Sequence, residues 1–202
     1  MIGKYFKKAP SDHPDSDRIP PGQHLANGFP VLTYGQTPTV DSKDWQLTIR
    51  GAIDGEAITL SYNDLLALPQ ETFTADFHCV TRWSKLDVCW TGVTLEELLK
   101  DISIRPTAQH VMQSCYGGYT TNLPLEDFLR EGNYLVHTLD GEPIPKEHGG
   151  PVRSLIPHLY AWKSAKWINE IAFLDEEELG FWERNGYHHR GEPFAEERYS
   201  SL

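Results

Sequence analysis

The segment Thr72–Trp83, with the sequence TFTADFHCVTRW, alternates apolar and polar side chains up to Cys79 and then loses the pattern. Alternation with a period of two predicts a strand. Cys79 is therefore expected at or just past a strand end, where a rigid base presents functional side chains. Far downstream lies His148–Arg153 (HGGPVR), followed by Lys163–Lys166 (KSAK). A lone thiol combined with a basic, glycine-containing segment points to a soft metal and an anionic cofactor.

The sequence around these segments predicts short strands and helices separated by many turns. Further strands are expected at residues 45–49, 57–60, 110–114, 135–139, 152–156 and 167–173. Ser61 with Asp64 and Thr94 with Glu97 form capping boxes, which predict helices over 61–68 and 95–100. A third helix is expected over 125–130, after Pro124. Together with the many Pro and Gly residues, this pattern favours a loop-rich α+β domain.

A chain of 202 residues is long enough for one sizeable domain and too short for two typical ones. Residues 1–30 are expected to form an extended, partly disordered N-terminal arm, with disorder in the first twenty residues. Residues 31–202 are expected to form the domain, which ends in an acidic tail. The acidic residues of this tail, expected to form a solvated face, are Asp175, Glu176, Glu177, Glu178, Glu192, Glu196 and Glu197.

The net charge of −11 disfavours two classes of partner. Nucleic acids and anionic membrane surfaces both attract basic proteins. No apolar stretch approaches the length needed to span a bilayer, and the first ten residues lack the apolar core of a secretory signal. Three cysteines, an odd number, fit a reducing compartment better than a disulfide framework. A cytoplasmic location is therefore expected.

Cys79 has three interpretations: a buried core thiol, a nucleophile or a metal ligand. The basic neighbours His78 and Arg82 are expected to lower its pKa and favour the reactive thiolate. A nucleophile would also need a histidine base, and the sequence does not show which of nine histidines lies nearby. Cys89 and Cys115 lack basic neighbours and are interpreted as core thiols. The pair His188-His189 is interpreted as exposed.

The segment from His148 to Lys166 concentrates basic residues in an acidic chain. Gly149 and Gly150 would let the backbone approach a ligand closely, and Arg153 offers a planar fork suited to phosphate. Lys163 and Lys166 lie three apart, so on a helical turn both amines would lie on one face. The alternative is an ordinary hairpin with solvated lysines. Tyr116–Pro124 (YGGYTTNLP) is either a packing loop or a substrate loop, and spacing alone does not decide between them.

Taken together, these segments resemble the molybdopterin-binding domain of the sulfite oxidase family in its short, single-domain form. The resemblance covers roughly residues 25–175 and implies mixed β-sheets with short helices and many loops. It implies that Cys79 ligates molybdenum and that the run containing His148 and Arg153 holds the pterin. It also implies that the pterin phosphate is received by the turn formed by Lys163, Ser164, Ala165 and Lys166.

The same resemblance assigns several further positions. It implies that Ser114 contacts the cofactor and that Tyr119 is the active-site tyrosine. The stretch Leu32, Thr33 and Tyr34 matches a pterin-contacting segment, and Arg82 could favour an anionic substrate. Sulfite oxidases carry additional arginines after the cysteine, whereas Arg82 is the one arginine here. The methionine sulfoxide reductase branch has Glu two residues after its cysteine, where this chain has Thr81.

The function implied by the resemblance is that of a metal-binding, molybdopterin-dependent oxidoreductase performing a two-electron oxygen-atom transfer, as sulfite oxidases do. A molybdenum-molybdopterin cofactor would supply the redox chemistry, and the protein would supply orientation and electrostatics. The expected substrate is a small oxyanion or an S- or N-oxide, and electrons would pass to or from a redox partner protein. Two alternatives stay open: a non-catalytic molybdopterin-binding or electron-carrier module, and a cysteine hydrolase.

Overall fold

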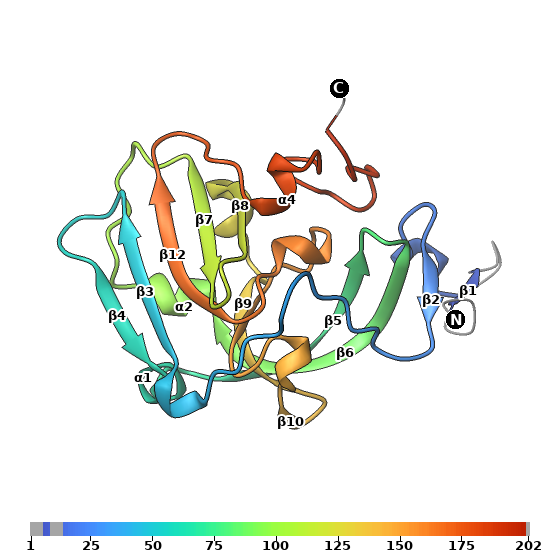
Figure 1. The fold of residues 1–202 in the computed structure, drawn as a ribbon, viewed down its shortest axis with the longest axis horizontal. Helices are drawn as coiled ribbons and strands as arrows, with labels where there is room; N and C mark the ends of the chain where they lie inside the picture. Colours follow the sequence, from blue (N-terminus) through green and yellow to red (C-terminus); the bar gives the residue numbers. More distant parts are fainter. Residues whose placement is uncertain (1–5, 9–13, 201–202) are drawn as a thin grey trace.

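The computed structural model describes residues 6–8 and 14–200, which form two β-sheets with short helices at their edges (Figure 1). The first sheet contains β1 (Phe6–Lys8), β2 (His24–Ala26), β5 (Glu71–Cys79), β6 (Trp83–Thr94), β9 (Tyr134–Leu139), β10 (Glu142–Pro143) and β11 (Arg153–Leu155). The second contains β3 (Gln46–Gly51), β4 (Ile58–Ser61), β7 (His110–Cys115), β8 (Thr120–Pro124) and β12 (Ile168–Leu174). The expected α+β class with mixed sheets is confirmed.

The long strand β6 organises the first sheet. It pairs antiparallel with β5 and β9 and, at its beginning, parallel with β2. β11 pairs with the other edge of β9, so the segment that begins with Arg153 joins the sheet that carries Cys79. The two motifs recognised in the sequence therefore belong to one sheet, although 74 positions separate these residues in the numbering (153 − 79).

The second sheet has the order β4-β3-β12-β7-β8. β12 pairs parallel with β3 and antiparallel with β7, which makes this sheet mixed. Trp45, fully buried just before β3, donates its indole N–H to the carbonyl of Ile168 at 2.8 Å. This bond fixes the start of β12, which directly follows the basic turn Lys163–Lys166.

Short helices connect the strands. They are α1 (Tyr62–Ala67), α2 (Leu95–Leu99), α3 (Leu125–Phe128), α4 (Phe181–Arg184) and the 3₁₀ helices η1 (Ser16–Arg18), η2 (Ser42–Asp44), η3 (Lys146–His148) and η4 (Ala161–Lys163). Ser61 and Asp64 form the predicted capping box, and the Thr94 hydroxyl caps α2 by accepting from the amide of Glu97. The sequence did not predict β6 or α4, nor β8, which occupies the end of the ambiguous segment Tyr116–Pro124.

The N-terminal arm is attached to the first sheet through β2. Residues 27–41, which have no regular structure, then lead from this sheet to η2 and β3 in the second (Figure 1). The predicted disorder covers residues 1–20, of which 1–5 and 9–13 lie outside the described residues. Residues 14–20 include η1, whose Arg18 binds Asp76 of β5 through its Nε at 3.0 Å.

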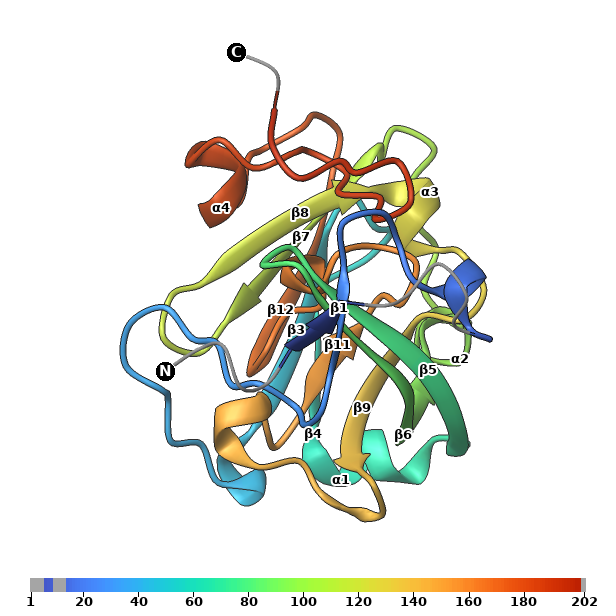
Figure 2. The same cartoon turned by 90° about the vertical axis from the view of Figure 1, so that its right-hand side faces the viewer.

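The C-terminal segment folds back onto the domain. α4 packs against β8, and a β-bridge joins Tyr187 to Tyr199 (Figure 2). His189 is exposed, as predicted, whereas His188 is half-buried and its Nδ1 accepts from the amides of Arg190 and Gly191. Across residues 6–8 and 14–200, none of the helices combines the length and the apolar character required to cross a membrane.

Candidate functional site

A cavity of about 360 Å³ opens where the end of β5, the N-terminal arm, the turn after η4 and the C-terminal segment meet. This volume lies within the range typical of pockets for small molecules. The lining residues are Phe29, Pro30, Leu32, Thr33, Tyr34, Phe77, Cys79, Val80, Thr81, Trp83, Tyr119, His148, Arg153, Ala161, Trp162, Ser164, Lys166, Trp167, Trp182 and Tyr187. The cavity therefore unites Cys79 with most of the basic segment.

Cys79 is the last residue of β5, as its place in the alternating segment predicted. A tight turn follows, closed by a bond from the Arg82 amide to the Cys79 carbonyl at 3.0 Å. The thiol Sγ lies 3.1 Å from the Thr81 hydroxyl. Burial raises the pKa of the Cys79 thiol, while Thr81, Lys166 and Arg198 act in the opposite direction. An activated nucleophile needs a lowered pKa, so this site suits a thiol that loses its proton to a metal.

The two neighbours expected to activate Cys79 do not approach its thiol. His78 projects from the opposite face of β5, where its Nδ1 lies 2.8 Å from the Ser84 hydroxyl, and burial lowers its pKa to about 4. Arg82 is exposed and reaches Gly22 of the N-terminal arm: a Cβ built on that glycine would lie 2.8 Å from the guanidinium. The prediction of cationic help from His78 and Arg82 was wrong, because strand alternation and the turn direct both side chains elsewhere.

Arg153 is the largest charged group buried at the cavity, with 1% of its surface exposed. Its guanidinium donates to the carbonyls of Ser154, His148 and Ser164, at 3.3, 2.8 and 3.0 Å. It also lies over the rings of Phe77 and Trp90. Burial lowers its pKa to about 10. A buried cation held only by neutral groups retains its full charge for an anion in the cavity.

Lys166 is the second cation that lacks a carboxylate partner at the cavity. Its ammonium donates to the carbonyls of Glu147 and Leu32, at 2.7 and 2.9 Å, and to the Thr33 hydroxyl at 3.4 Å. Burial, followed by the repulsion of Arg153, lowers the pKa of Lys166 to about 7. The bonds to Leu32 and Thr33 bring the predicted arm stretch to the same cavity, at which Tyr34 also lies.

His148 lines the cavity and stacks on Phe29, with ring centroids 4.7 Å apart. The two glycines after it serve the chain's own packing. A Cβ on Gly150 would lie 1.9 Å from the Ile144 carbonyl oxygen, and one on Gly149, whose φ is +105°, would lie 2.8 Å from the Lys166 side chain. Gly149 and Gly150 were expected to let a ligand approach the backbone. In the structure, both are required by close packing within the chain, against Lys166 and Ile144.

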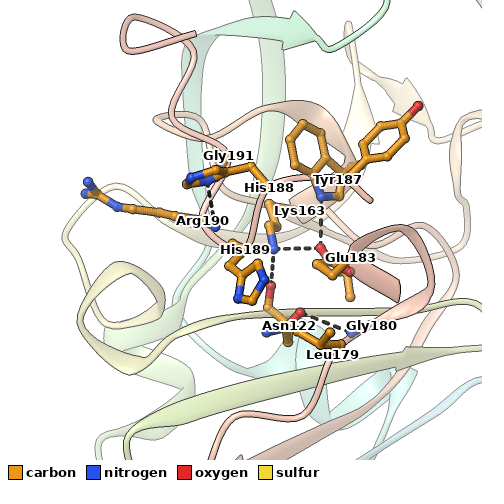
Figure 3. Close-up of polar contacts among 12 residues, drawn as sticks. Asn122, Lys163, Leu179, Gly180, Glu183, Tyr187, His188, His189, Arg190 and Gly191 are labelled. Atoms are coloured by element: carbon orange, nitrogen blue, oxygen red, sulfur yellow. Dashed lines mark hydrogen bonds and ion pairs between the residues drawn. The ribbon is translucent and has the colours of Figure 1, made fainter. Parts of the chain in front are cut away.

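Lys163 does not lie on the same side as Lys166. η4 ends at Lys163, and the backbone of Ser164 (φ −93°, ψ 89°) is no longer helical, so the predicted common face does not form. Lys163 does not line the cavity, and Figure 3 shows its ammonium directed at Glu183, with which it forms a fully buried ion pair at 2.6 Å. Its ammonium also donates to the carbonyls of Asn122 and His189.

The remaining predicted residues divide between the cavity and its supports. Ser164 and Tyr119 line the cavity, and the Tyr119 hydroxyl donates to the Trp162 carbonyl at 2.7 Å. Ala165 is fully buried in the core and Ser114 donates to Glu170 on the second sheet at 3.2 Å, so neither lines the cavity. The predicted cofactor contacts of Ala165 and Ser114 have no counterpart in this geometry.

Sequence reasoning missed the aromatic residues at the cavity. Phe29, Trp83, Trp162, Trp167, Trp182 and Tyr187 all line it, together with Phe77 and the two tyrosines already named. Trp83 is 2% exposed, and its indole N–H has no partner among the described residues. No local pattern marks these side chains, because they come from five separate segments.

The donors around the cavity fit a molybdenum-pterin group. Cys79 offers one soft sulfur ligand, a single one among the lining residues, and a pterin dithiolene would bring further sulfur of its own. Arg153, Lys166 and His148 lie beside it, and the lining residues include no Asp or Glu, although the chain carries 29 of them. The cavity therefore suits an anionic, flat and sulfur-rich ligand.

Comparison with known proteins also indicates a molybdopterin-binding protein. The family described as "Oxidoreductase molybdopterin binding domain" matches residues 34–182. "Uncharacterized oxidoreductase YuiH" of Bacillus subtilis is 43% identical over 197 residues, which cover 97% of this chain and 98% of that protein. "Putative protein-methionine-sulfoxide reductase subunit YedZ1" of Azospira oryzae is 27% identical, covering 84% of this chain and 65% of the relative.

More distant relatives are longer proteins. "Sulfite oxidase, mitochondrial" of Rattus norvegicus is 25% identical over 74% of this chain, which spans 33% of that protein. The crystal structure of the sulfane dehydrogenase SoxCD from Paracoccus pantotrophus matches with a TM-score of 0.64 and 20% identity, over 74% of this chain and 42% of that one. Sequence, fold and cavity agree, and the chain belongs to the molybdopterin-binding oxidoreductases of the sulfite oxidase family.

Proposed function

We propose that this protein binds the molybdenum-molybdopterin cofactor in the cavity and carries out a two-electron oxygen-atom transfer, with Cys79 as the protein ligand of the metal. The observation that carries the proposal is the meeting of one thiol with two cations, the buried Arg153 and the half-buried Lys166, neither of which forms an ion pair with a carboxylate of the described residues. When bound, the cofactor supplies the redox chemistry and accepts or releases the oxygen atom.

The residues of the chain bind and orient in this proposal. Lys166 receives the pterin phosphate, Arg153 and His148 face the pterin, and Leu32 to Tyr34 cover it. Tyr119 lines the cavity, and its hydroxyl is the proposed donor to a substrate oxygen, in exchange for its present bond to the Trp162 carbonyl. Arg82 takes no part in substrate binding in this proposal, since its side chain lies beside Gly22.

Replacement of Cys79 tests the proposal directly. Cys79→Ser is expected to lower turnover by about hundredfold or more, because a hydroxyl is a much poorer ligand for a soft metal than a thiolate. Metal and pterin analysis of the purified protein, together with the thiolate-to-molybdenum absorption band, gives a readout that does not depend on activity. Cys89→Ser is the matched control, since Cys89 lies on β6 and does not line the cavity.

Full turnover and stoichiometric molybdenum in the Cys79→Ser protein would contradict the ligand assignment. A dye-linked assay of fully loaded wild-type protein separates the enzyme from the carrier alternative, because a carrier module would show no turnover with any sulfur or nitrogen oxide. The redox partner protein and the cytoplasmic location stay predictions.

A further inference from the structure

The mouth of the cavity is built from aromatic side chains, which we call the aromatic wall: Tyr34, Trp162, Trp182 and Tyr187. Their rings contact one another in a row, with centroid distances of 5.7 Å between Tyr34 and Trp182, 4.9 Å between Trp182 and Tyr187, and 5.3 Å between Tyr187 and Trp162. Tyr34 is 70% exposed, so the wall faces solvent at one end and Cys79 at the other. Three distant parts of the chain contribute to it.

The buried Lys163–Glu183 pair holds this wall in place. One oxygen of Glu183 accepts from Lys163 at 2.6 Å, from the Trp162 indole at 2.9 Å and from the Thr121 hydroxyl at 3.0 Å. Glu183 belongs to α4, next to Trp182, and Lys163 follows Trp162 directly. The Glu183 carboxylate therefore ties Trp162 to Thr121 of β8, and Trp182 precedes Glu183 directly in α4; Figure 3 shows the contact of this carboxylate with Lys163.

Among the described residues, no cation is left at the mouth for a substrate. Arg153 and Lys166 are assigned to the cofactor, and Lys163 is neutralised by Glu183. Arg82 lies beside Gly22, and Arg198, 4% exposed, donates to the carbonyls of Val80 and Pro21. The faces of aromatic rings carry partial negative charge, and the net charge of −11 adds a repulsive field. A small oxyanion would meet no free cation of the described residues at this mouth.

We propose that the substrate is an uncharged oxo compound with an aromatic body, an aryl sulfoxide or a heteroaromatic N-oxide, and that the aromatic wall selects it. This inference rests on the proposed function and names its substrate class. In the reductive direction, the S–O or N–O bond breaks, and the oxygen leaves as water after gaining two protons. The sulfur or nitrogen gains two electrons, supplied in an assay by two equivalents of reduced methyl viologen.

A substrate panel with molybdenum-loaded wild-type protein tests the class. Methyl phenyl sulfoxide and pyridine N-oxide are expected to show kcat/KM values about tenfold above that of dimethyl sulfoxide, the size of one good aromatic contact. Nitrate, with the same donor, and sulfite, with ferricyanide as acceptor, are expected to fall lower still. A higher kcat/KM for either oxyanion, or equal values for dimethyl and aryl sulfoxides, overturns the inference.

Failure of the proposed function would look different. Fully loaded protein that turns over no member of the panel overturns the enzyme assignment and this inference with it. An oxyanion preference overturns the substrate class alone and leaves the oxidoreductase intact.

Variants of the wall locate the selectivity. Trp182→Ala is expected to raise the KM for methyl phenyl sulfoxide by about tenfold more than the KM for dimethyl sulfoxide. Phe194→Ala is the matched control, because Phe194 is a half-exposed aromatic residue that contacts His78 and does not line the cavity. Equal changes of both KM values in Trp182→Ala, or the same selectivity loss in Phe194→Ala, contradict the role of the wall.

The role of the Lys163–Glu183 pair in positioning the aromatic wall is tested by the preference for aryl over dimethyl sulfoxide, and not by activity alone. Glu183→Gln is expected to lower the preference for aryl over dimethyl sulfoxide, because Lys163 loses its counter-charge and α4 shifts. The double variant Lys163→Met/Glu183→Gln removes both charges, keeps an oxygen for the Trp162 indole and is expected to restore the preference. If the folded Glu183→Gln protein keeps the wild-type preference for aryl over dimethyl sulfoxide, the ion pair does not contribute to substrate specificity.

Discussion

Two lysines three positions apart in the chain have opposite surroundings. Lys163 lies in a fully buried pair with the carboxylate of Glu183, whereas Lys166, at the cavity, is bound only by two carbonyls and a hydroxyl. Burial lowers the pKa of both ammonium groups. Lys163 has a carboxylate in direct contact to offset this effect, whereas Cys79 and Glu147 raise the pKa of Lys166 without an ion-pair contact.

The difference separates a structural cation from a binding cation. A buried pair that is complete within the chain stabilises a fixed arrangement, and removal of one partner leaves an expensive lone charge. A cation that faces a cavity with no carboxylate in contact is available to pair with an anionic ligand from outside. The motif KSAK looks uniform in the sequence, yet its two lysines belong to these two different classes.

Removal of the Glu183 charge should give the largest effect on stability. Glu183→Gln is expected to lower the free energy of unfolding by about 3–5 kcal/mol, because Lys163 is left buried without a counter-charge. Urea denaturation of the cofactor-free protein measures this change. In Lys163→Met/Glu183→Gln most of the loss should be regained, and a double variant that is no more stable than the single one would show that the charge is not the cause.

Removal of the Lys166 charge should give an intermediate effect, and on a different quantity. Lys166→Met is expected to weaken retention of the pterin cofactor by about 1.5–3 kcal/mol, the usual contribution of a hydrogen bond to a charged group. Pterin content after dialysis measures retention. Lys146→Met, a change at an exposed lysine of the neighbouring η3, is the control. Equal cofactor retention in the two variants would contradict the distinction between the lysines.

An exposed ion pair should give the smallest effect. Arg50 and Glu170 join β3 to β12 at 2.7 Å, and the bond from Arg50 lowers the pKa of Glu170. The stability from this pair is present above the pKa of an unfolded glutamate, about 4.3. It is lost as the pH falls through the lower pKa of the folded state. Arg50→Met should therefore cost less than about 1 kcal/mol at pH 7 and progressively less in acid.

Thermal unfolding of the Arg50→Met protein and the wild type between pH 3 and pH 7 measures this contribution. A difference that grows as the pH falls would contradict the assigned direction. Because Arg50 is half-exposed, water is expected to screen this pair, in contrast to the fully buried Lys163–Glu183 pair.

The fold was largely predictable wherever local chemistry determines structure. Alternation identified β5 and placed Cys79 at its end, and the N-cap residues Ser61 and Thr94 marked the starts of α1 and α2. β8 was not identified, because two glycines precede it, it ends in a proline, and its buried and partly exposed residues do not alternate.

The candidate site was predictable only in part. Cys79, His148, Arg153 and Lys166 come from local motifs, and the structure brings these four side chains to one cavity. The partner of Lys163 could not be foreseen, since Glu183 lies 20 residues away in a tail whose acidic residues suggested only a solvated face. The aromatic wall escaped detection for the same reason, because its members meet only after the two ends of the chain fold back.

The bonding of the Lys166 ammonium has a consequence for cofactor loading. An ammonium carries three hydrogens, and all three are engaged: by Glu147, Leu32 and Thr33. A phosphate oxygen can join them only in exchange for one of these acceptors, two of which belong to the covering arm. The pterin phosphate and residues 32–33 therefore compete for the Lys166 ammonium. Residues 32–33 should be more accessible to a protease in the cofactor-loaded protein than in the empty one.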